Sequence, residues 1–326
     1  MQVNSFTATY ISFFSKMLKK EGYKVRTAST RSNKAMRLAE MLSMIVRYKD
    51  TTDIVLIDTY GATNFYYAYL VGKACQMLGM EYIPILHGGN LPERLEGSTK
   101  LSQDLFGHAK VNIAPSKYLY ESFRSYGFKN LQIIPNSINT ENYPFKERKK
   151  FRPKLLWVRR FQKRYNPLMA LKVLQIIKKK YPEVSLCMVG PEKDGSMATC
   201  KKLAEKFDLD VRFTGKLKKK HWAQLASNYD FFINTTSVDN TPISVIEAMS
   251  LGLTVISTDV GGMPVLIQNG YDGVLVPEAD DEAMATKIME LIEDPEKAGA
   301  ICEHAREKVE LFDWNLVKEQ WNRVLA

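Results

Sequence analysis

Two carboxylates, Asp239 and Glu247, are separated by seven residues in a segment whose pattern predicts a loop followed by a helix. Asn240 or Thr241 can cap that helix, and Pro242 suits its first turn because no N–H is needed there. The free N–H groups at the positive helix end form an anion site suited to a diphosphate. Glu247, about one and a half turns into the helix, can accept hydrogen bonds from ribose hydroxyls, and Asp239 is placed to meet a sugar. The alternative is a surface glutamate and a turn aspartate.

A basic segment, which includes Arg160, Lys163 and Arg164, follows the apolar run 155–158. Its positive charge could meet a phosphorylated ligand, but a basic loop is also typical of a solvated surface. The sequence leaves both interpretations open.

A third candidate is His87, which follows the apolar run 82–86 and precedes Gly88 and Gly89. Paired glycines let a backbone approach a ligand closely, and histidine can exchange a proton near neutral pH. The alternative is that the three residues form only a turn.

These residues must be positioned by the elements before them. Short β-branched runs alternate with stretches of helical periodicity, such as 62–78 and 116–126. This alternation predicts an α/β fold with parallel sheets, in which ligands bind beyond the carboxyl ends of the strands. The expected strands are 54–57, 82–86, 111–114, 131–134, 155–158, 186–189, 211–214, 231–234, 254–257 and 274–276.

A polar stretch over 143–153, with two prolines and a run of charges, marks the expected domain boundary. We therefore predict an N-terminal Rossmann-like domain over 1–147 and a C-terminal Rossmann-like domain over 148–312. A helix within 313–326 is expected to cross back to the first domain.

The start of the chain predicts an incomplete first domain. Only Met1 to Asn4 precede a helix-like stretch that ends near Lys20, and the run 24–28 is interpreted as the second strand. Strands usually have ~5–6 residues, so four are too few for a first strand and its loop. The helix-like stretch carries aromatic residues beside lysines. It fits either a core helix or an interfacial helix that contacts an anionic membrane.

Bulk properties exclude several classes of protein. The net charge is +10, partly in the runs 146–152 and 216–220, which could be solvated loops. The basic runs carry no signature of a nucleic-acid-binding fold, so no nucleic-acid partner is expected. No apolar run approaches the ~18 residues of a membrane span, and the start does not resemble a signal peptide. The four cysteines are scattered along the sequence, which is typical of reduced core residues in a cytoplasmic protein. The four histidines are also scattered, so the sequence predicts no metal site.

The segment 239–264 resembles the donor-site core of the retaining glycosyltransferases of family 4, also called glycosyl transferases group 1. In that family two carboxylates separated by seven residues precede an Ala-Met-Ala-Gly-like helix end, a strand and Asp-x-Gly-Gly. The corresponding residues here are Asp239 and Glu247, then Ala248-Met249-Ser250-Leu251-Gly252 and Asp259-Val260-Gly261-Gly262. Asp239 departs from the usual glutamate. The resemblance implies the GT-B fold, which consists of two facing Rossmann-like domains.

Residues 155–167 resemble a second segment of the family, in which a strand is followed by Gly-Arg-Leu and, further on, by Lys-Gly. The Arg and Lys of that segment hold the leaving diphosphate. Arg160 matches the arginine and is implied to be catalytic, with Asp239 and His87. Arg159 stands at the usual glycine and Tyr165 at the usual lysine, whose charge Lys163 or Arg164 could supply. Gly215 lies at the end of a predicted strand. In the family, the nucleotide base binds at the corresponding strand end.

The resemblance implies a retaining, metal-independent hexosyltransferase. It would move sugar from a nucleotide-sugar donor, expected to be a UDP-sugar, to a glycan or lipid-linked acceptor in cell-surface polysaccharide synthesis. No cofactor is expected, and the location implied is the cytoplasm, at the inner face of the membrane. The alternatives are a sugar-nucleotide epimerase or phosphorylase of the same fold, or a non-catalytic sugar-nucleotide binding protein.

Overall fold

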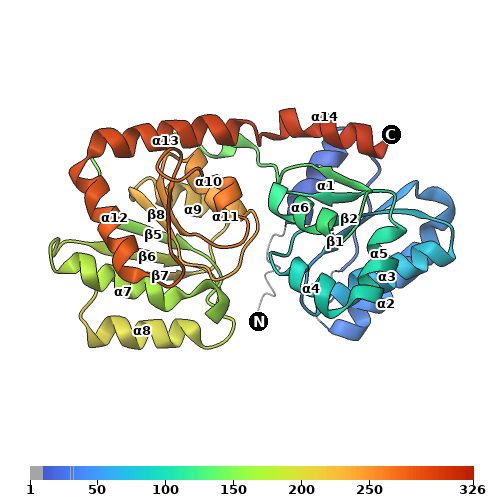
Figure 1. Cartoon of the computed structure of the whole chain (residues 1–326), viewed down its shortest axis with the longest axis horizontal. Helices are drawn as coiled ribbons and strands as arrows, with labels where there is room; N and C mark the ends of the chain where they lie inside the picture. The colour runs from blue at the N-terminus through green and yellow to red at the C-terminus, as the bar shows by residue number, and fades with distance from the viewer. Residues whose placement is uncertain (1–9, 30, 32) are drawn as a thin grey trace. The chain divides into compact units, whose positions relative to one another are not determined.

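The computed structural model describes residues 10–29, 31 and 33–326, which form two compact units (Figure 1). The first unit runs to Ala114 and takes in Ser122–Gln132 and Leu325. The second comprises Pro115–Glu121, Ile133–Val324 and Ala326. Both units are built from parallel strands and helices, so the expected α/β class is confirmed.

A six-stranded parallel sheet in the order β10-β9-β8-β5-β6-β7 forms the centre of the second unit. Its strands are β5 (Lys154–Val158), β6 (Ser185–Val189), β7 (Val211–Gly215), β8 (Phe231–Asn234), β9 (Thr254–Thr258) and β10 (Val274–Val276). The helices are α7 (Pro167–Lys178), α8 (Ser196–Lys206), α9 (Lys219–Ala226), α10 (Ile243–Ser250), α11 (Met263–Leu266), α12 (Asp281–Glu293), α13 (Pro295–Glu310) and α14 (Trp314–Leu325). The six predicted strands of this half are all present.

Helices cover both faces of this sheet and bury two apolar cores (Figure 1). Successive side chains of a strand point to opposite faces, so Leu155 and Trp157 enter one core and Leu156 enters the other. Such burial on both faces explains why these strands read as continuous apolar runs.

The strand order creates a switch point between β5 and β8. From β5 the chain adds β6 and β7 on one side, then returns to add β8, β9 and β10 on the other. The chain therefore leaves neighbouring strands β5 and β8 toward opposite sides of the sheet, so their carboxyl ends form a topological switch point. In open α/β sheets this is where ligands bind.

The first unit has a four-stranded parallel sheet in the order β1-β2-β3-β4. Its strands are β1 (Ile54–Thr59), β2 (Glu81–Leu86), β3 (Asn112–Ala114) and β4 (Leu131–Ile133). The helices before and among them are α1 (Tyr10–Lys20), α2 (Lys34–Tyr48), α3 (Asn64–Met77), α4 (Leu91–Gly97), α5 (Thr99–Gly107) and α6 (Lys117–Ser125).

The predicted strand over 24–28 is wrong: these residues form a loop between α1 and α2. β1 pairs with β2 along one edge, and within the part of the chain that is described no strand pairs with its other edge. A β-like pattern becomes a strand only where a neighbour completes its hydrogen bonds. The expected gap at Met1 to Asn4 lies outside the described residues.

The second unit is continuous from Ile133 to Val324, so it includes residues that precede the boundary predicted between 147 and 148. Ile138 and Tyr143 show the physical reason, because both are buried in an apolar core of the second unit. The Arg148 side chain is also buried against the second sheet. Its guanidinium donates to the Leu251 carbonyl at 3.1 Å and to the Asp230 carboxylate at 3.2 Å. The charge run 146–152 is therefore not simply a solvated loop, because Arg148 ties it to the sheet.

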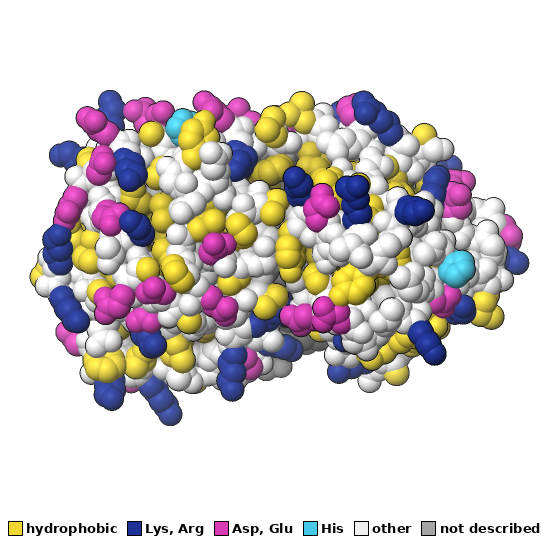
Figure 2. Space-filling model, viewed as in Figure 1, with side chains coloured by type: hydrophobic (Ala, Val, Ile, Leu, Met, Phe, Trp, Pro, Cys, Tyr) yellow, Lys and Arg dark blue, Asp and Glu magenta, His cyan; other side chains and the backbone are white. Residues whose placement is uncertain are grey.

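Three further expectations concern termini and surface. α1 buries Phe14 and Leu18, as the core-helix interpretation requires, while its membrane contact stays a prediction. α14 forms where a final helix was expected, and its crossing to the first unit also stays a prediction. On the face shown in Figure 2, lysine and arginine side chains are scattered rather than gathered in one stripe. Among the described helices, none combines the length and apolar character needed to cross a bilayer.

Candidate functional site

The loop that leaves β8 carries Asp239 and Asn240 and is shaped by two glycines after β9. A Cβ at Gly261 would overlap the Asp239 carbonyl, and one at Gly262 would overlap that of Asn240. The Gly262 N–H instead donates to the Asp239 carbonyl at 3.1 Å. The Gly-Gly pair therefore lets the two loops lie in direct contact, which fixes the backbone that presents Asp239.

Glu247 lies on α10 with only 3% of its surface exposed, so the surface-residue interpretation is wrong. Its Oε1 accepts hydrogen bonds from the Tyr143 hydroxyl and from Lys219 Nζ, each at 2.5 Å. Burial, and then the charge and hydrogen bond of Glu247, raise the pKa of Tyr143 far above its usual range. Tyr143 is therefore a neutral donor. No described residue donates to Oε2, so that oxygen remains available to a ligand hydroxyl.

Asp239 forms an ion pair through Oδ2 with Nη2 of Arg159, the first residue after β5. Its Oδ1 accepts the Asn240 N–H at 3.0 Å. The side chains of Asp239 and Arg159 are 17% and 16% exposed, so both can still reach a ligand. The sequence pattern predicted a role for Arg160, which is solvent-exposed here, and none for Arg159. The signal that could have found Arg159 was its replacement of the family's glycine.

Arg164 joins Arg159 around the ring of Tyr165, while Lys163 does not. The guanidinium carbons of Arg159 and Arg164 lie 5.0 and 5.7 Å from the Tyr165 ring centroid. The Nε of each arginine is buried and has no hydrogen-bond acceptor among the described residues. Lys163 is exposed, and its backbone N–H donates to the Asp194 carboxylate at 2.9 Å.

The predicted cap of α10 is wrong. The helix begins at Ile243 with Pro242 in the capping position, and neither Asn240 nor Thr241 caps it. Asn240 Oδ1 is already engaged by the Ser116 hydroxyl, a residue of the same unit. Three polar atoms beside this helix start are nevertheless buried without a partner in the described structure: Asn240 Nδ2, Thr241 Oγ1 and Ser244 Oγ. Together with the free first-turn N–H groups they suit an anion.

Gly215 ends β7 at the same edge of the sheet, in a left-handed conformation with φ of 66°. Its carbonyl accepts the Gly190 N–H at 2.9 Å, which joins the exits of β7 and β6. Nowhere in the described residues do three histidine, cysteine or acidic side chains gather as a metal site would require.

His87 belongs to the first unit, where it follows β2 and pairs with a residue that the sequence did not reveal. His87 Nε2 lies 3.0 Å from Oδ1 of Asp58, near the end of β1. The His87 side chain is 6% exposed and packs against the ring of Tyr60 at 5.5 Å between centroids. Asp58 is 29 residues away in sequence, so only the parallel pairing of β1 and β2 brings the two side chains together.

Gly88 and Gly89 continue from His87 toward α4. A Cβ at Gly88 would lie 2.7 Å from the Gly61 nitrogen, so this glycine accommodates another part of the backbone. The turn interpretation thus accounts for Gly88 without a ligand.

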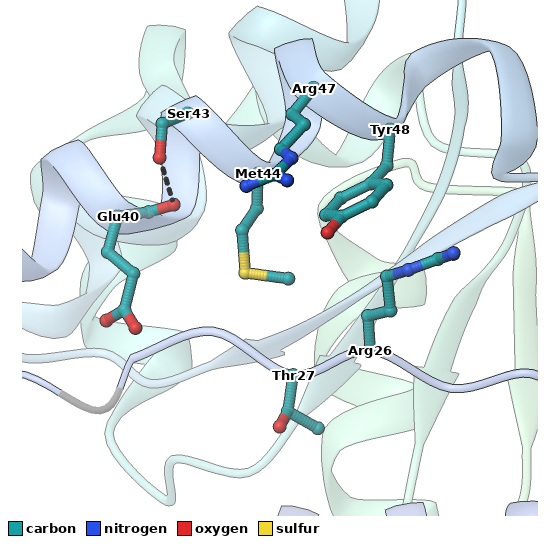
Figure 3. Close-up of a pocket in the computed structure, with 7 residues that line it drawn as sticks. All are labelled: Arg26, Thr27, Glu40, Ser43, Met44, Arg47 and Tyr48. Atoms are coloured by element: carbon teal, nitrogen blue, oxygen red, sulfur yellow. Dashed lines mark hydrogen bonds between the residues drawn. The ribbon is translucent and has the colours of Figure 1, made fainter.

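A separate hollow of about 590 Å³ lies between α2 and the loop after α1 (Figure 3). Arg26 and Arg47 lie over the ring of Tyr48, 4.2 and 5.4 Å from its centroid. None of the residues selected from the sequence lines this hollow, and its arginines already have an aromatic partner. The switch point of the second sheet is therefore the stronger candidate site.

Comparison with known proteins identifies the relatives of this architecture. The sequence pattern of the family described as glycosyl transferases group 1 matches residues 139–308, more than half of the chain. A sulfoquinovosyl transferase of Arabidopsis thaliana is 32% identical over 150 residues, which cover 44% of this chain and 28% of that protein. The chain spans 28%, 37% and 21% of the lengths of three curated relatives that it matches.

Two solved structures have the same fold. Sucrose-phosphate synthase from Thermosynechococcus elongatus superposes with a TM-score of 0.78 at 18% identity, covering 97% of this chain and 91% of that one. HepE from Anabaena, solved with UDP and glucose, gives 0.77 at 20% identity, covering 96% and 89%. The chain has the GT-B fold and belongs to the glycosyl transferases group 1 family.

Proposed function

We propose that this protein is a retaining glycosyltransferase that transfers a sugar from a UDP-sugar to a glycan or lipid-linked acceptor. The observation that carries the proposal is the chemistry gathered at the switch point of the second sheet. Glu247 offers Oε2 there, α10 offers its first-turn N–H groups, and arginines from the β5 exit offer positive charge. Ribose hydroxyls fit the free oxygen of Glu247, and a diphosphate fits both the helix N-terminus and the arginines.

The proposed chemistry depends on charge that develops as the donor ionises. When the bond to the diphosphate breaks, the sugar becomes oxocarbenium-like and the leaving group gains negative charge. Arg160, Arg164 and the N-terminus of α10 stabilise that negative charge, and losing one such group should cost on the order of 10²–10³ in rate. The acceptor hydroxyl then attacks the face from which the diphosphate departs and passes its proton to a phosphate oxygen of that leaving group, which retains the anomeric configuration. No cofactor takes part.

Relatives support the choice of donor and pathway. The Anabaena neighbour was solved with UDP and glucose and, separately, with UDP-glucose. A relative from Erwinia amylovora is described as an amylovoran biosynthesis glycosyltransferase, and it is 23% identical over 78% of this chain. By analogy we propose a UDP-sugar as the donor and cell-surface polysaccharide synthesis as the process.

The test is to incubate the protein with UDP-sugars, with and without glycan or lipid-linked acceptors, and to analyse the products by NMR. We expect sugar transfer with an α-linked product from an α-linked donor. Conversion of the donor to an isomer without acceptor would instead identify an epimerase. Consumption of glycan and phosphate would identify a phosphorylase, and donor binding without any turnover would identify a binding protein.

We also propose that the protein works in the cytoplasm at the inner face of the membrane, where a lipid-linked acceptor would be held. The support is α1, whose exposed Lys16, Lys19 and Lys20 could meet anionic headgroups. Cosedimentation with vesicles that contain anionic lipid at low salt tests this, and equal binding to neutral vesicles would contradict it.

A further inference from the structure

The ion pair between Arg159 and Asp239 lies at the switch point itself, because one residue leaves β5 and the other follows β8. The Arg159 N–H donates to the Val189 carbonyl at 3.0 Å. A Cβ at Gly190 would overlap the Arg159 carbonyl, so the two backbones are in direct contact. The backbone of Arg159 is thus fixed on both sides, and its guanidinium is directed toward the exit of β8.

This pair changes what the site offers to a sugar. A carboxylate at position 239 would ordinarily accept hydrogen bonds from sugar hydroxyls. Here both of its oxygens already have a donor, one from Asn240 and one from Arg159. A guanidinium has five N–H donors and no acceptor, and only its Nη2 is committed to Asp239. The sugar side of the site is therefore rich in donors.

The positive charge nearby also exceeds what Asp239 balances. Arg164 shares the Tyr165 ring with Arg159, and Nε of each lacks an acceptor in the described structure. Arg160 is exposed beside them. The diphosphate already has Arg160, Arg164 and the N-terminus of α10 as candidate partners. Arg159 differs because it is paired with Asp239, the residue proposed to meet the sugar.

We infer that the donor sugar carries an acidic substituent, such as a carboxylate, and that Arg159 is the residue that recognises it. A guanidinium matches a carboxylate in planar, two-pronged geometry, which no lysine reproduces. Asp239 is the counter-ion that holds Arg159 in place until the acidic sugar binds. The inference rests on the proposed function, because it specifies the sugar of the donor.

The test compares matched neutral and acidic donors by titration calorimetry: UDP-glucose with UDP-glucuronate, and GDP-mannose with GDP-mannuronate. UDP and GDP alone serve as references. We expect the intact protein to bind the acidic member of one pair at least about 10-fold more tightly than the neutral member. R159Q should weaken binding of the acidic donor about 10- to 100-fold, as loss of a charge-assisted hydrogen bond predicts. It should leave the free nucleoside diphosphate unchanged.

Two further variants make the assignment specific. D239N frees Arg159 from its counter-ion, so it should keep or strengthen binding of the acidic donor. Exposed Arg212 of β7 provides the matched control, and R212Q should retain the preference for the acidic donor.

Three outcomes overturn the inference. If R159Q weakens the free diphosphate as much as the acidic donor, Arg159 binds the diphosphate instead. If the neutral donor binds as tightly as the acidic one, the inference fails while the proposed function stands. If no nucleotide or nucleotide-sugar binds, the proposed function fails as well.

Discussion

At the scale of single residues, the orientation of the Glu247 carboxylate depends on two neighbouring side chains. Tyr143 and Lys219 both donate to one oxygen of Glu247, and this leaves the other oxygen for the ligand. Tyr143 is buried and neutral, so its contribution is a directed hydrogen bond rather than a charge. It is a positioning residue, because it acts on the ligand through Glu247.

Tyr143→Phe should therefore raise the Kd for the nucleotide about 10-fold, as the loss of one hydrogen bond to a carboxylate predicts. It should change kcat little, because the ribose contact is made equally in the ground state and transition state. Titration of the nucleoside diphosphate together with steady-state kinetics measures both effects. Tyr229→Phe is the control, since Tyr229 is also a buried tyrosine of this unit but contacts Cys187. A loss of stability without a change in Kd would contradict the positioning role.

A second expectation at this scale concerns metal ions. The arginines and the N-terminus of α10 are the proposed partners of the leaving diphosphate, so we expect no requirement for a divalent ion. Turnover should therefore be unchanged in a chelator, within about twofold, whereas one lost charge-stabilising group would cost on the order of 10²–10³. Steady-state rates with and without chelator measure this. Loss of activity that manganese restores would refute it.

The sequence predicted the acids of the site but not their partners. Asp239 and Glu247 could be found because their spacing relates two positions close in the chain. Arg159 is 80 residues from Asp239, and Tyr143 is 104 residues from Glu247. Such pairs depend on which strands are neighbours and how each loop leaves the sheet, which no local pattern contains. Arg159 and Arg160 illustrate this, because of these two adjacent residues at one strand end one pairs with Asp239 and the other is exposed.

At the scale of elements, local pattern was sufficient wherever a strand is buried on both faces. β8 was predicted without error, because a short run of buried residues that ends at a turn is typical of a central strand. The run 24–28 failed for the opposite reason: its alternation is real, but a strand also needs a neighbour. The predicted cap of α10 was wrong because Asn240 Oδ1 accepts a hydrogen bond from the Ser116 hydroxyl and not from the N–H groups of α10.

The linker that enters the second unit carries its own testable feature. Asp230 is 1% exposed and accepts hydrogen bonds from Arg148 and Arg152, at 3.2 and 2.8 Å. Asp230→Ala should leave the buried Arg148 without its counter-ion and lower the free energy of unfolding by about 3–5 kcal/mol. Urea unfolding measures this. Glu290→Ala removes an exposed ion pair with Lys287 and should cost about 0–1 kcal/mol. Equal effects of the two substitutions would show that the buried cluster adds nothing.

At the scale of the molecule, the two units have separate sheets and the cysteines are divided between them. Cys75 belongs to the first unit, while Cys187, Cys200 and Cys302 belong to the second. All four are buried and free of disulfides, as the sequence predicted. Burial raises the pKa of Cys75 and of Cys302 to about 11 and that of Cys200 to about 12.

These thiols therefore report the unfolding of each unit. The thiolate is the reactive form, so a raised pKa suppresses alkylation at pH 8 until unfolding exposes the thiol. A nucleotide that binds only the second unit at about 100 times its Kd should stabilise that unit by about 2.7 kcal/mol. In dilute urea it should slow labelling of Cys187, Cys200 and Cys302 about 100-fold and leave Cys75 unchanged. Mass spectrometry of alkylated peptides measures each site, with Cys75 as the internal control. Protection of Cys75 alone would place the nucleotide on the first unit, and equal protection of all four would mean that the units unfold together.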